Sequence, residues 1–457
     1  MQDNTDQQDR QQPATIYAGP RGTAVKILNR IERSDSYLDK LLDAELRSDD
    51  MNELDKGLMN EIVTGVIRWK LKLDWVLTGF FHGNFTKAET NIKNALRVAL
   101  YQIQFLDRVP HSAAVNESVE FIKRLRGQKA ADLVNAILRN IIRNIDNIRY
   151  PDPEEDKVRN LSVIDSHPVW MTKRWMERYG VDDAKRMMEA NNAIPDLALR
   201  VNRLKVDFNY FLSLLEKNQI QYTRSPYLDY FVRVQHMAGI GSSELFQQGY
   251  FSVQDESAGI PVLLMDPKPG ERIIDLCSAP GGKTTFIGEL MKNIGEIIAV
   301  DRYETRLHLV KNAYQRLGIT IVHVVTDDGA TIVIPPADKV LVDAPCSGLG
   351  VLSKKPDAKW QRDADDILKL AQLQKSLLEN AATLVKSGGV LIYSTCTIEP
   401  EENIDLIKEF LDRHQEFSIE SARNSIHQDL VGNLGQVETF RHKHGMDGSF
   451  SIRLRKK

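Results

Sequence analysis

The sequence contains little cysteine. Only three cysteines, Cys277, Cys346 and Cys396, occur in 457 residues, and no two of them have the C-x-x-C spacing of a metal site. Three cysteines are too few for the disulfide framework of a small secreted protein, and this scarcity favours a reducing compartment such as the cytoplasm. The composition therefore directs attention to the three cysteines as free thiols, and we expect no bound metal.

The sequence also lacks the features of a membrane or exported protein. No apolar run approaches the roughly 18 residues that span a bilayer. The first residues, MQDNTDQQDRQQP, do not have the basic and then apolar arrangement of a signal peptide. We expect residues 1–20 to form a disordered tail, and we expect a cytoplasmic protein that does not bind membranes.

An excess of positive charge is absent as well. The formal net charge is -3, which argues against strong indiscriminate binding to nucleic acid, because such binding depends on cations that displace counterions from phosphates. Residues 121–143 nevertheless contain six basic residues and one acid, Asp132. A solvated helical face and a local RNA-binding surface are both consistent with this segment.

The spacing of apolar residues changes along the chain, whose length suits two to four domains of roughly 100–200 residues each. Over 21–150 they recur with the period of a helix, as in Leu96, Ala99, Leu100 and Ile103. The segment RYPDPEEDK, residues 149–157, carries two prolines and a run of acids and is predicted to be a linker. We expect 151–265 to hold this linker and a small α+β segment.

From residue 266 onward, apolar strands alternate with helices. Strand-like runs occur in RIIDLCS, GEIIAVD, TIVHVV, DKVLVDAPCSG and GVLIYSTCT, and helices are expected at 303–317, 364–386 and 401–412. This alternation is typical of a parallel sheet that helices cover on both faces, so 266–457 is predicted to form an α/β Rossmann-like domain. In such sheets ligands bind beyond the carboxyl ends of the strands, where the sequence places Asp275, Asp301, Asp343 and Cys396.

The segment DLCSAPGGKTT, residues 275–285, nearly matches a phosphate loop. The pattern G-x-x-x-x-G-K-[ST] aligns with Gly282 and Lys283 but requires a glycine where this chain has Cys277. A nucleoside cofactor fits the segment better, because Gly281 and Gly282 let the backbone approach a ligand closely. A nucleotide hydrolase stays open as an alternative.

Asp301 indicates which nucleoside cofactor to expect. It ends a predicted strand about 20 residues after the glycines, where an acid accepts the ribose hydroxyls of an adenosine. A helix N-cap is the alternative interpretation of this aspartate. A dinucleotide site requires G-x-G-x-x-G, which CSAPGG does not contain, so the prediction is S-adenosylmethionine, a cofactor without phosphate.

Three motifs together resemble those of the RNA cytosine-5 methyltransferases. They are DLCSAPGGKT, DAPCSG and YSTCT, and DGSFSIRLRK resembles the closing strand pair of that family. In the N-terminal half, LDKGLMNEIVTGVIRWKLKLDWVL and LRVALYQIQFLDRVPHSAAVNESVEFIK resemble the NusB-like RNA-binding domain. From residue 21 almost the whole chain resembles the bacterial 16S ribosomal RNA cytosine-5 methyltransferases. The resemblance implies an all-α NusB-like domain over 21–150 and an S-adenosylmethionine-dependent methyltransferase domain over 266–457.

The resemblance also implies a reaction. A cysteine thiolate adds to carbon 6 of a specific cytosine and activates carbon 5 for methylation. Cys396 would be the nucleophile, Cys346 would assist proton removal or product release, and Asp343 would contact both the cofactor and the base edge. DNA cytosine-5 methyltransferases place the nucleophile in a Pro-Cys motif, here Cys346, so the reverse assignment is the alternative. For the function as a whole, the alternatives are a transfer RNA acceptor and a non-catalytic RNA-binding protein of the NusB type.

The cofactor contacts that the resemblance implies come from the glycine loop and from strand-end aspartates. They are Cys277, Ser278, Ala279, Pro280, Gly281, Gly282, Lys283, Asp301, Asp328 and Asp343. We assign Asp328 rather than Asp327 because the Asp-Gly pair matches the family, although Ala330 stands where the family often has arginine.

Candidate RNA contacts come from two basic segments. They are Lys354, Lys355 and Lys359 of KKPDAKW, and Lys123, Arg124 and Arg126 of the 121–143 segment. Contacts of this kind to phosphates position an RNA without reading its sequence. The expected partner is 16S ribosomal RNA, free or early in ribosome assembly, and we expect the protein to act as a monomer.

Overall fold

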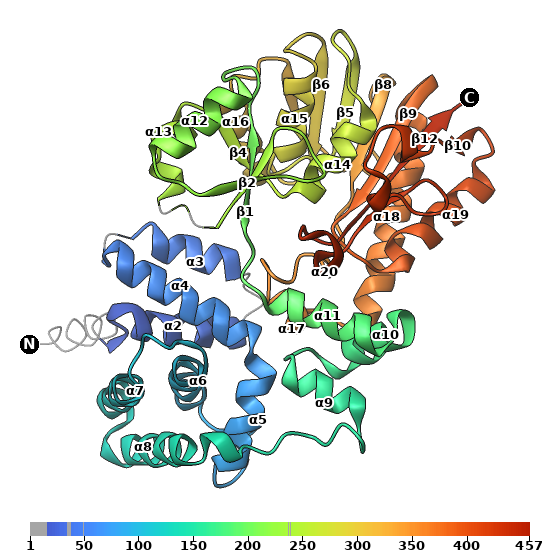
Figure 1. The fold of residues 1–457 in the computed structure, drawn as a ribbon. Coiled ribbons are helices and arrows are strands. Elements are labelled where there is room, and N and C mark those ends of the chain that lie inside the picture. The colour runs from blue at the N-terminus through green and yellow to red at the C-terminus, as the bar shows by residue number, and fades with distance from the viewer. Residues whose placement is uncertain (1–15, 34–37, 49, 236, 238) are drawn as a thin grey trace, which may run out of the picture. The chain divides into compact units, whose positions relative to one another are not determined.

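The structure is a computed structural model that describes residues 16–33, 38–48, 50–235, 237 and 239–457. Unit 1 comprises the described residues up to Asn192 together with Lys355–Gln361, and unit 2 comprises Ala193–Lys354 and Arg362–Lys457 (Figure 1). Residues 1–15 of the expected tail lie outside the described residues. Helix α2 begins at Gly19, so the last two residues of the expected tail belong to this helix.

Unit 1 is helical, as the spacing of its apolar residues predicts. Its helices are α2 (Gly19–Arg33), α3 (Leu38–Leu46), α4 (Glu53–Arg68), α5 (Lys70–Phe80), α6 (Thr90–Phe105), α7 (His111–Arg126), α8 (Gln128–Arg143), α9 (Lys157–Ile164), α10 (Val169–Tyr179), α11 (Val181–Asn192) and α17 (Ala358–Gln361), with 3-10 turns at Phe85–Lys87 and Ile145–Asn147. Across the described part of the chain, every helix is too short or too polar to cross a bilayer.

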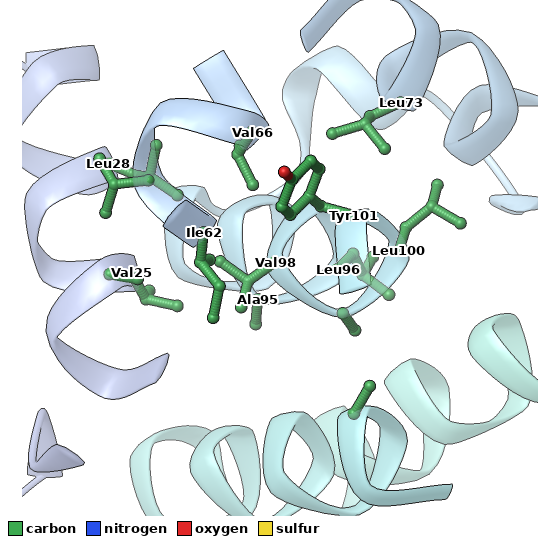
Figure 2. Packing of buried hydrophobic residues seen from close by; sticks show 14 of the residues in the cluster. Val25, Leu28, Ile62, Val66, Leu73, Ala95, Leu96, Val98, Leu100 and Tyr101 are labelled. Atoms are coloured by element: carbon green, nitrogen blue, oxygen red, sulfur yellow. The ribbon is translucent and has the colours of Figure 1, made fainter. Parts of the chain in front are cut away.

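Helix α6 forms the centre of unit 1. It is buried on nearly all sides because α2, α4, α5, α7 and α8 pack around it, and its buried residues include the polar Asn94 and Arg97 beside the apolar ones. Figure 2 shows Leu28 of α2 and Ile62 of α4 facing Ala95 and Val98 of α6. The apolar residues that recur with a helical period in the sequence therefore form the core of this helical bundle.

Unit 2 contains a four-stranded antiparallel sheet in the order β2-β3-β1-β4. Its elements are β1 (Leu197–Val201), α12 (Phe208–Lys217), β2 (Tyr222–Arg224), β3 (Phe231–Val234), a 3-10 turn at Ile240–Ser242, α13 (Glu244–Gln247) and β4 (Phe251–Val253). The expected small α+β segment is divided in the structure, because its helices α9, α10 and α11 belong to unit 1, where α9 packs on α5 and α10.

The larger sheet of unit 2 has a parallel core with antiparallel strands added at one side. Its strands are β5 (Arg272–Leu276), β6 (Glu296–Asp301), β7 (Val322–Thr326), β8 (Ala337–Asp343), β9 (Val385–Thr395), β10 (Phe417–Ile419), β11 (Val437–Thr439) and β12 (Ser449–Lys456). The order is β10-β12-β9-β8-β5-β6-β7, with β11 pairing β12. The expected parallel strands are confirmed, and the motif DGSFSIRLRK forms β12, antiparallel to β9.

Both faces of this sheet are buried, which explains why its strands read as continuous apolar runs. Ile273 and Ile297 pack on one face, and their neighbours Ile274 and Ile298 pack on the other. The first face is covered by α14 (Glu256–Met265), α15 (Gly282–Leu290) and α16 (Glu304–Leu317), and the second by α18 (Ala364–Leu384) and α19 (Ile404–Arg413). The remaining elements are α20 (Arg441–His444) and 3-10 turns at Pro400–Glu402, Ala422–Asn424 and Gln428–Leu430.

Candidate active site

The candidate site lies at the carboxyl edge of the large sheet in unit 2. The parallel registers pair Leu276 of β5 with Val342 of β8, and Asp343 of β8 with Ser394 of β9. Segments that leave neighbouring parallel strands at the same level emerge at the same edge of the sheet. The glycine loop after β5, Asp343 and the cysteine after β9 are therefore brought to one place, as the sequence predicts.

Two thiols meet at this edge. The Sγ atoms of Cys346 and Cys396 are 3.0 Å apart, and the backbone N–H of Cys396 donates to the sulfur of Cys346 at 3.3 Å. The hydrogen bond with Cys396, and then burial, raise the pKa of the Cys346 thiol well above its usual range. Cys396 is exposed. The pair thus combines an accessible sulfur with a neighbouring sulfur that holds its proton tightly.

Lys283 has an anionic partner in the site. Its Nζ lies 2.6 Å from Oδ2 of Asp343. Burial acts to lower the pKa of Lys283, but the Asp343 carboxylate outweighs burial and raises it, and a Cys396 thiolate adds to this rise. Lys283 is therefore an ammonium group that neutralises the Asp343 carboxylate. It also interacts electrostatically with the Cys396 sulfur.

Asp301 fixes the glycine loop to the next strand. Its Oδ2 accepts the backbone N–H of Ala279 at 3.2 Å and lies 3.3 Å from Nη1 of Arg306, while Oδ1 accepts the backbone N–H of Tyr303 at 3.1 Å. The N-cap residue of α16 is Tyr303, so the alternative interpretation of Asp301 as that cap is wrong. Gly281 has a φ of 100°, a left-handed conformation that glycine adopts without strain.

The residues at this edge fit an adenosine-type cofactor with a polar amino acid end. Asp275 Oδ1 and Ser278 Oγ are buried and have no hydrogen-bond partner among the described residues. Because buried polar atoms are normally satisfied, such orphans indicate a missing polar ligand. Burial raises the pKa of Asp275 to about 7, while Thr284 donates to its Oδ2 at 2.6 Å and opposes this rise.

Asp328 and Cys277, two further cofactor candidates, differ in their surroundings. Asp328 Oδ1 accepts the backbone N–H of Ala330 at 3.0 Å, which shapes the loop after β7. Cys277 has a φ of 62° and packs against the core on one face of the sheet. Burial raises the pKa of the Cys277 thiol to about 12, which makes this cysteine a poor nucleophile.

The structure changes the interpretation of KKPDAKW. Lys359 is wholly buried in unit 1, where its Nζ donates to Arg68 O and Ser166 O, each at 3.2 Å, and to Asn192 Oδ1 at 2.7 Å. The expected RNA contact of Lys359 is therefore wrong, because this ammonium group has no access to a phosphate. Lys355 is exposed, with its Nζ 3.5 Å from Asp39, and stays a candidate.

Lys354 lies in unit 2 and bridges two carboxylates. Its Nζ contacts Asp255 and lies 2.8 Å from Oδ2 of Asp447, and both carboxylates are buried or nearly so. Burial acts to lower the pKa of Lys354, but the two aspartates outweigh burial and raise it. This lysine holds the loop after Cys346 to two other segments, and its RNA contact stays a prediction.

Replacing Lys354 with methionine should lower the free energy of unfolding by about 1–3 kcal/mol, because it leaves buried carboxylates without their partner. Lys355 is the next residue in the chain and is exposed, so Lys355→Met is the matched variant. Its free energy of unfolding should stay within about 0.5 kcal/mol of the wild type. Urea denaturation of both variants measures the difference. Equal stability of the two variants, with weaker RNA binding by Lys354→Met, would favour a phosphate contact over a structural role for Lys354.

The basic segment 121–143 lies in unit 1, and its three candidate RNA contacts are exposed. Lys123, Arg124 and Arg126 occupy the last turn of α7 and are exposed. Arg126 pairs with Glu89, its Nη2 lying 2.5 Å from the carboxylate. RNA binding by these three residues stays a prediction.

Sequence reasoning missed two buried charged residues that support the site. Arg200, inside the apolar strand β1, donates to the carbonyl of Gly282 in the glycine loop at 2.7 Å. Glu402 accepts from Ser347, the residue after Cys346. An arginine within the apolar run LALRV is an unusual pattern that could have drawn attention, whereas Glu402 stands in an ordinary acidic stretch, EPEEN.

The large sheet of unit 2 has seven strands in one hydrogen-bonded order, with a parallel core. A glycine loop follows β5, and Asp301 ends β6. This fold and site define a Rossmann-like methyltransferase domain, preceded in the chain by a helical domain. Residues 262–455 match the family described as 16S rRNA methyltransferase RsmB/F, 19–143 match the NusB family, and 167–240 match a ferredoxin-like domain of RsmF/B-like methyltransferases. The chain belongs to the RsmB/F family of 16S rRNA methyltransferases.

Similar proteins agree with this membership. A protein of Bacillus subtilis (strain 168) named probable ribosomal RNA small subunit methyltransferase B is 36% identical, over 96% of this chain and 98% of its own. Ribosomal RNA small subunit methyltransferase B of Erwinia tasmaniensis is 33% identical over 95% and 98%. Among solved structures, that of PH0851 matches with a TM-score of 0.81 and 28% identity over 96% of this chain and 99% of that chain. A methyltransferase homolog from Pyrococcus horikoshii matches 66% of this chain with a TM-score of 0.59 and 28% identity.

Proposed function

We propose that this protein transfers the methyl group of S-adenosylmethionine to carbon 5 of a cytosine in 16S ribosomal RNA, in the cytoplasm. The observation that carries this proposal is the pair of sulfur atoms 3.0 Å apart at the carboxyl edge of the sheet. A single thiol suffices for many nucleophilic enzymes, but methylation at carbon 5 also needs a second group that helps to break the thioether after transfer. Cys396 and Cys346 provide both groups.

The glycine loop and the strand-end aspartates would hold the cofactor. Asp301 would accept the ribose hydroxyls, and the buried orphan atoms Asp275 Oδ1 and Ser278 Oγ offer unfilled polar partners. When bound, S-adenosylmethionine supplies an electrophilic methyl group. Asp328 stays a candidate contact on the loop after β7.

Cys396 would begin the reaction. Its thiolate attacks carbon 6 of the cytosine, a sulfur–carbon bond forms, and the displaced electron pair makes carbon 5 nucleophilic. The Lys283 ammonium favours this thiolate electrostatically, because each charge stabilises the other. Asp343, held by Lys283 at 2.6 Å, would contact the base edge.

Cys346 would assist release. The proton at carbon 5 would pass to a solvent base, its bonding electron pair would form the double bond between carbons 5 and 6, and the bond between carbon 6 and the Cys396 sulfur would break with its electron pair returning to sulfur. A neighbouring S–H at 3.0 Å stabilises the departing thiolate by a hydrogen bond. The raised pKa of Cys346 keeps this proton in place.

The acceptor is the part of the proposal that an experiment should test first. Labelled methyl transfer should be measured to unmodified 16S ribosomal RNA without proteins, to assembled small subunits and to unmodified transfer RNA. We expect protein-free 16S RNA to be preferred and 5-methylcytidine to be the product by mass spectrometry. A preference for transfer RNA would contradict the ribosomal assignment. Absence of S-adenosylmethionine binding by calorimetry would instead support a non-catalytic RNA-binding protein, and hydrolysis of ATP would support the phosphate-loop alternative.

A further inference from the structure

A buried hydrogen-bond network lies next to the two thiols, and Glu402 is at its centre. Its Oε1 accepts the backbone N–H of Ser347 at 2.8 Å and the side-chain amide of Gln374 at 2.9 Å. Its Oε2 accepts the hydroxyl of Ser347. Glu402 and Gln374 are 0% exposed. A carboxylate that is withdrawn from water in this way needs several donors to offset its desolvation.

The network holds both segments that carry a thiol. Ser347 directly follows Cys346, and Gln374 also donates to the carbonyl of Pro345, which directly precedes it, at 2.9 Å. On the other segment, the hydroxyl of Thr397, the residue after Cys396, lies 2.8 Å from the hydroxyl of Ser347. One carboxylate therefore fixes the residues on both sides of Cys346 and, through one hydroxyl, the residue after Cys396.

Glu402 is itself rigidly placed. It ends the 3-10 turn Pro400–Glu402, and its carbonyl accepts the hydroxyl of the buried Tyr393 at 2.7 Å. Tyr393 belongs to β9, the strand that leads to Cys396. Burial also raises the pKa of Glu402, which shows that the site gives up solvation to keep a carboxyl group there.

We propose that Glu402 is a positioning residue that sets the distance between the sulfur atoms of Cys346 and Cys396 and thereby the rate at which the methylated RNA is released. This inference rests on the proposed function, because it concerns the thioether to carbon 6. Formation of the thioether depends on Cys396 and Lys283, whereas its breakage also needs Cys346 at hydrogen-bond distance. A displacement of about 1 Å between reacting groups costs about 10²-fold in rate, so a loosened network should slow release far more than formation.

Two substitutions of Glu402 separate geometry from charge. In Glu402→Gln, the amide oxygen keeps accepting from Ser347 and Gln374, the amide N–H donates to the Ser347 hydroxyl, and that hydroxyl donates to Thr397. The distances are thus preserved without a charge, and release should stay close to the wild-type rate. In Glu402→Ala, the donors of Ser347 and Gln374 lose their acceptor, so release should slow by about 10²-fold.

The experiment is a rapid-quench single turnover with unmodified 16S RNA and S-adenosylmethionine, in which the covalent protein–RNA species is followed by denaturing electrophoresis. We expect this species to accumulate in Glu402→Ala and not in Glu402→Gln, with unchanged S-adenosylmethionine affinity in both. Asp405→Ala, which removes an exposed carboxylate nearby in the chain, is the control and should behave as the wild type. Thr397→Val removes the contact between Ser347 and the second segment, together with the acceptor of the Glu399 backbone N–H, and should slow release about fivefold to tenfold, which provides a test if Glu402→Ala does not fold.

The outcomes that would overturn the inference are distinct. If formation and release slow equally in Glu402→Ala or Thr397→Val, these residues only stabilise the fold. If Glu402→Gln is as slow as Glu402→Ala, charge and not distance controls release. If the Cys346→Ala variant forms no covalent species at all, the roles that the proposed function assigns to the two thiols are wrong, and the positioning role of Glu402 fails with them. If Cys346→Ala traps the species but Thr397→Val and Glu402→Ala release it at the wild-type rate, only the positioning role is contradicted.

Discussion

Replacing Cys396 with alanine should abolish methyl transfer and leave no covalent protein–RNA species, whereas replacing Cys346 should allow that species to form and prevent its release. The first loss should exceed about 10³-fold in turnover, because no other thiol takes the place of the nucleophile. The second effect follows from the 3.0 Å contact, since Cys346 supplies the S–H that stabilises the departing Cys396 thiolate. Labelled methyl transfer and denaturing electrophoresis measure the two steps separately.

The opposite pattern would reverse the roles of the thiols. If Cys346→Ala prevents the covalent species and Cys396→Ala accumulates it, the nucleophile is in the Pro-Cys motif, as in DNA cytosine-5 methyltransferases. As a control, both variants should bind S-adenosylmethionine and unfold thermally as the wild type does, because each substitution removes only a small side chain near the surface of the site. A variant that fails this control reports a damaged fold and needs Cys→Ser in place of Cys→Ala.

Replacing Arg200 with methionine should lower the free energy of unfolding of unit 2 by about 3–5 kcal/mol, because it leaves a buried carboxylate without its counter-charge. Arg200 is 0% exposed, its Nη2 lies 2.7 Å from Glu289, and its guanidinium lies over the ring of Phe286. It also donates to the carbonyl of Gly282, so the affinity for S-adenosylmethionine should fall as well. Chemical denaturation and calorimetric titration measure the two losses.

The stability deficit of Arg200→Met should depend on pH. Burial raises the pKa of Glu289 in the wild type while Arg200 lowers it, so removal of Arg200 should raise this pKa further. A carboxyl group in the unfolded chain has a pKa of about 4.3. If its pKa is higher in the folded protein, the free energy of unfolding falls as the pH rises from about 4.3 through the folded-state pKa. The deficit should therefore be larger at pH 8 than at pH 5.

Two further variants make this test specific. Adding Glu289→Gln to Arg200→Met removes the unpaired charge and should recover part of the stability and most of the pH dependence. Arg203→Met, at an exposed arginine that follows β1 and lies over Tyr230, is the matched control and should have a small effect. A deficit below about 1 kcal/mol for Arg200→Met would show that water or a neighbour replaces the guanidinium.

Much of the fold follows from local patterns. Strands buried on both faces are apolar at most positions, and this property revealed β5, β6, β8 and β9 and their order along the chain. Apolar residues that recur with the period of a helix revealed α6 and α18, because the buried side of a helix is also mainly apolar. The site residues at strand ends could also be predicted, because parallel strands bring their carboxyl ends to one edge whatever the details of packing.

The assignment of segments to units could not be predicted in the same way. Helices α9, α10 and α11 have apolar faces, but an apolar face in the sequence does not indicate which element will cover it. In the structure these helices belong to unit 1, whereas the strands β1–β4 belong to unit 2. Lys359 shows the same limit. A lysine among charged residues is usually solvated, yet its ammonium is enclosed by three oxygens from distant parts of the chain.

The sequence by itself determined the parallel strands of the large sheet and the glycine loop, in which Cys277 stands where a phosphate loop has glycine. It also placed Asp275, Asp301, Asp343 and Cys396 at or just past the ends of those strands. Only the tertiary structure decided that Lys283 pairs with Asp343, that Arg200 holds the glycine loop from another sheet, and that Glu402 ties the two thiol segments together. The physical reason is range. Periodicity and turn chemistry act over a few neighbouring residues, whereas these contacts join groups 50 to 82 positions apart. Only the packing of whole elements brings such groups within hydrogen-bond distance.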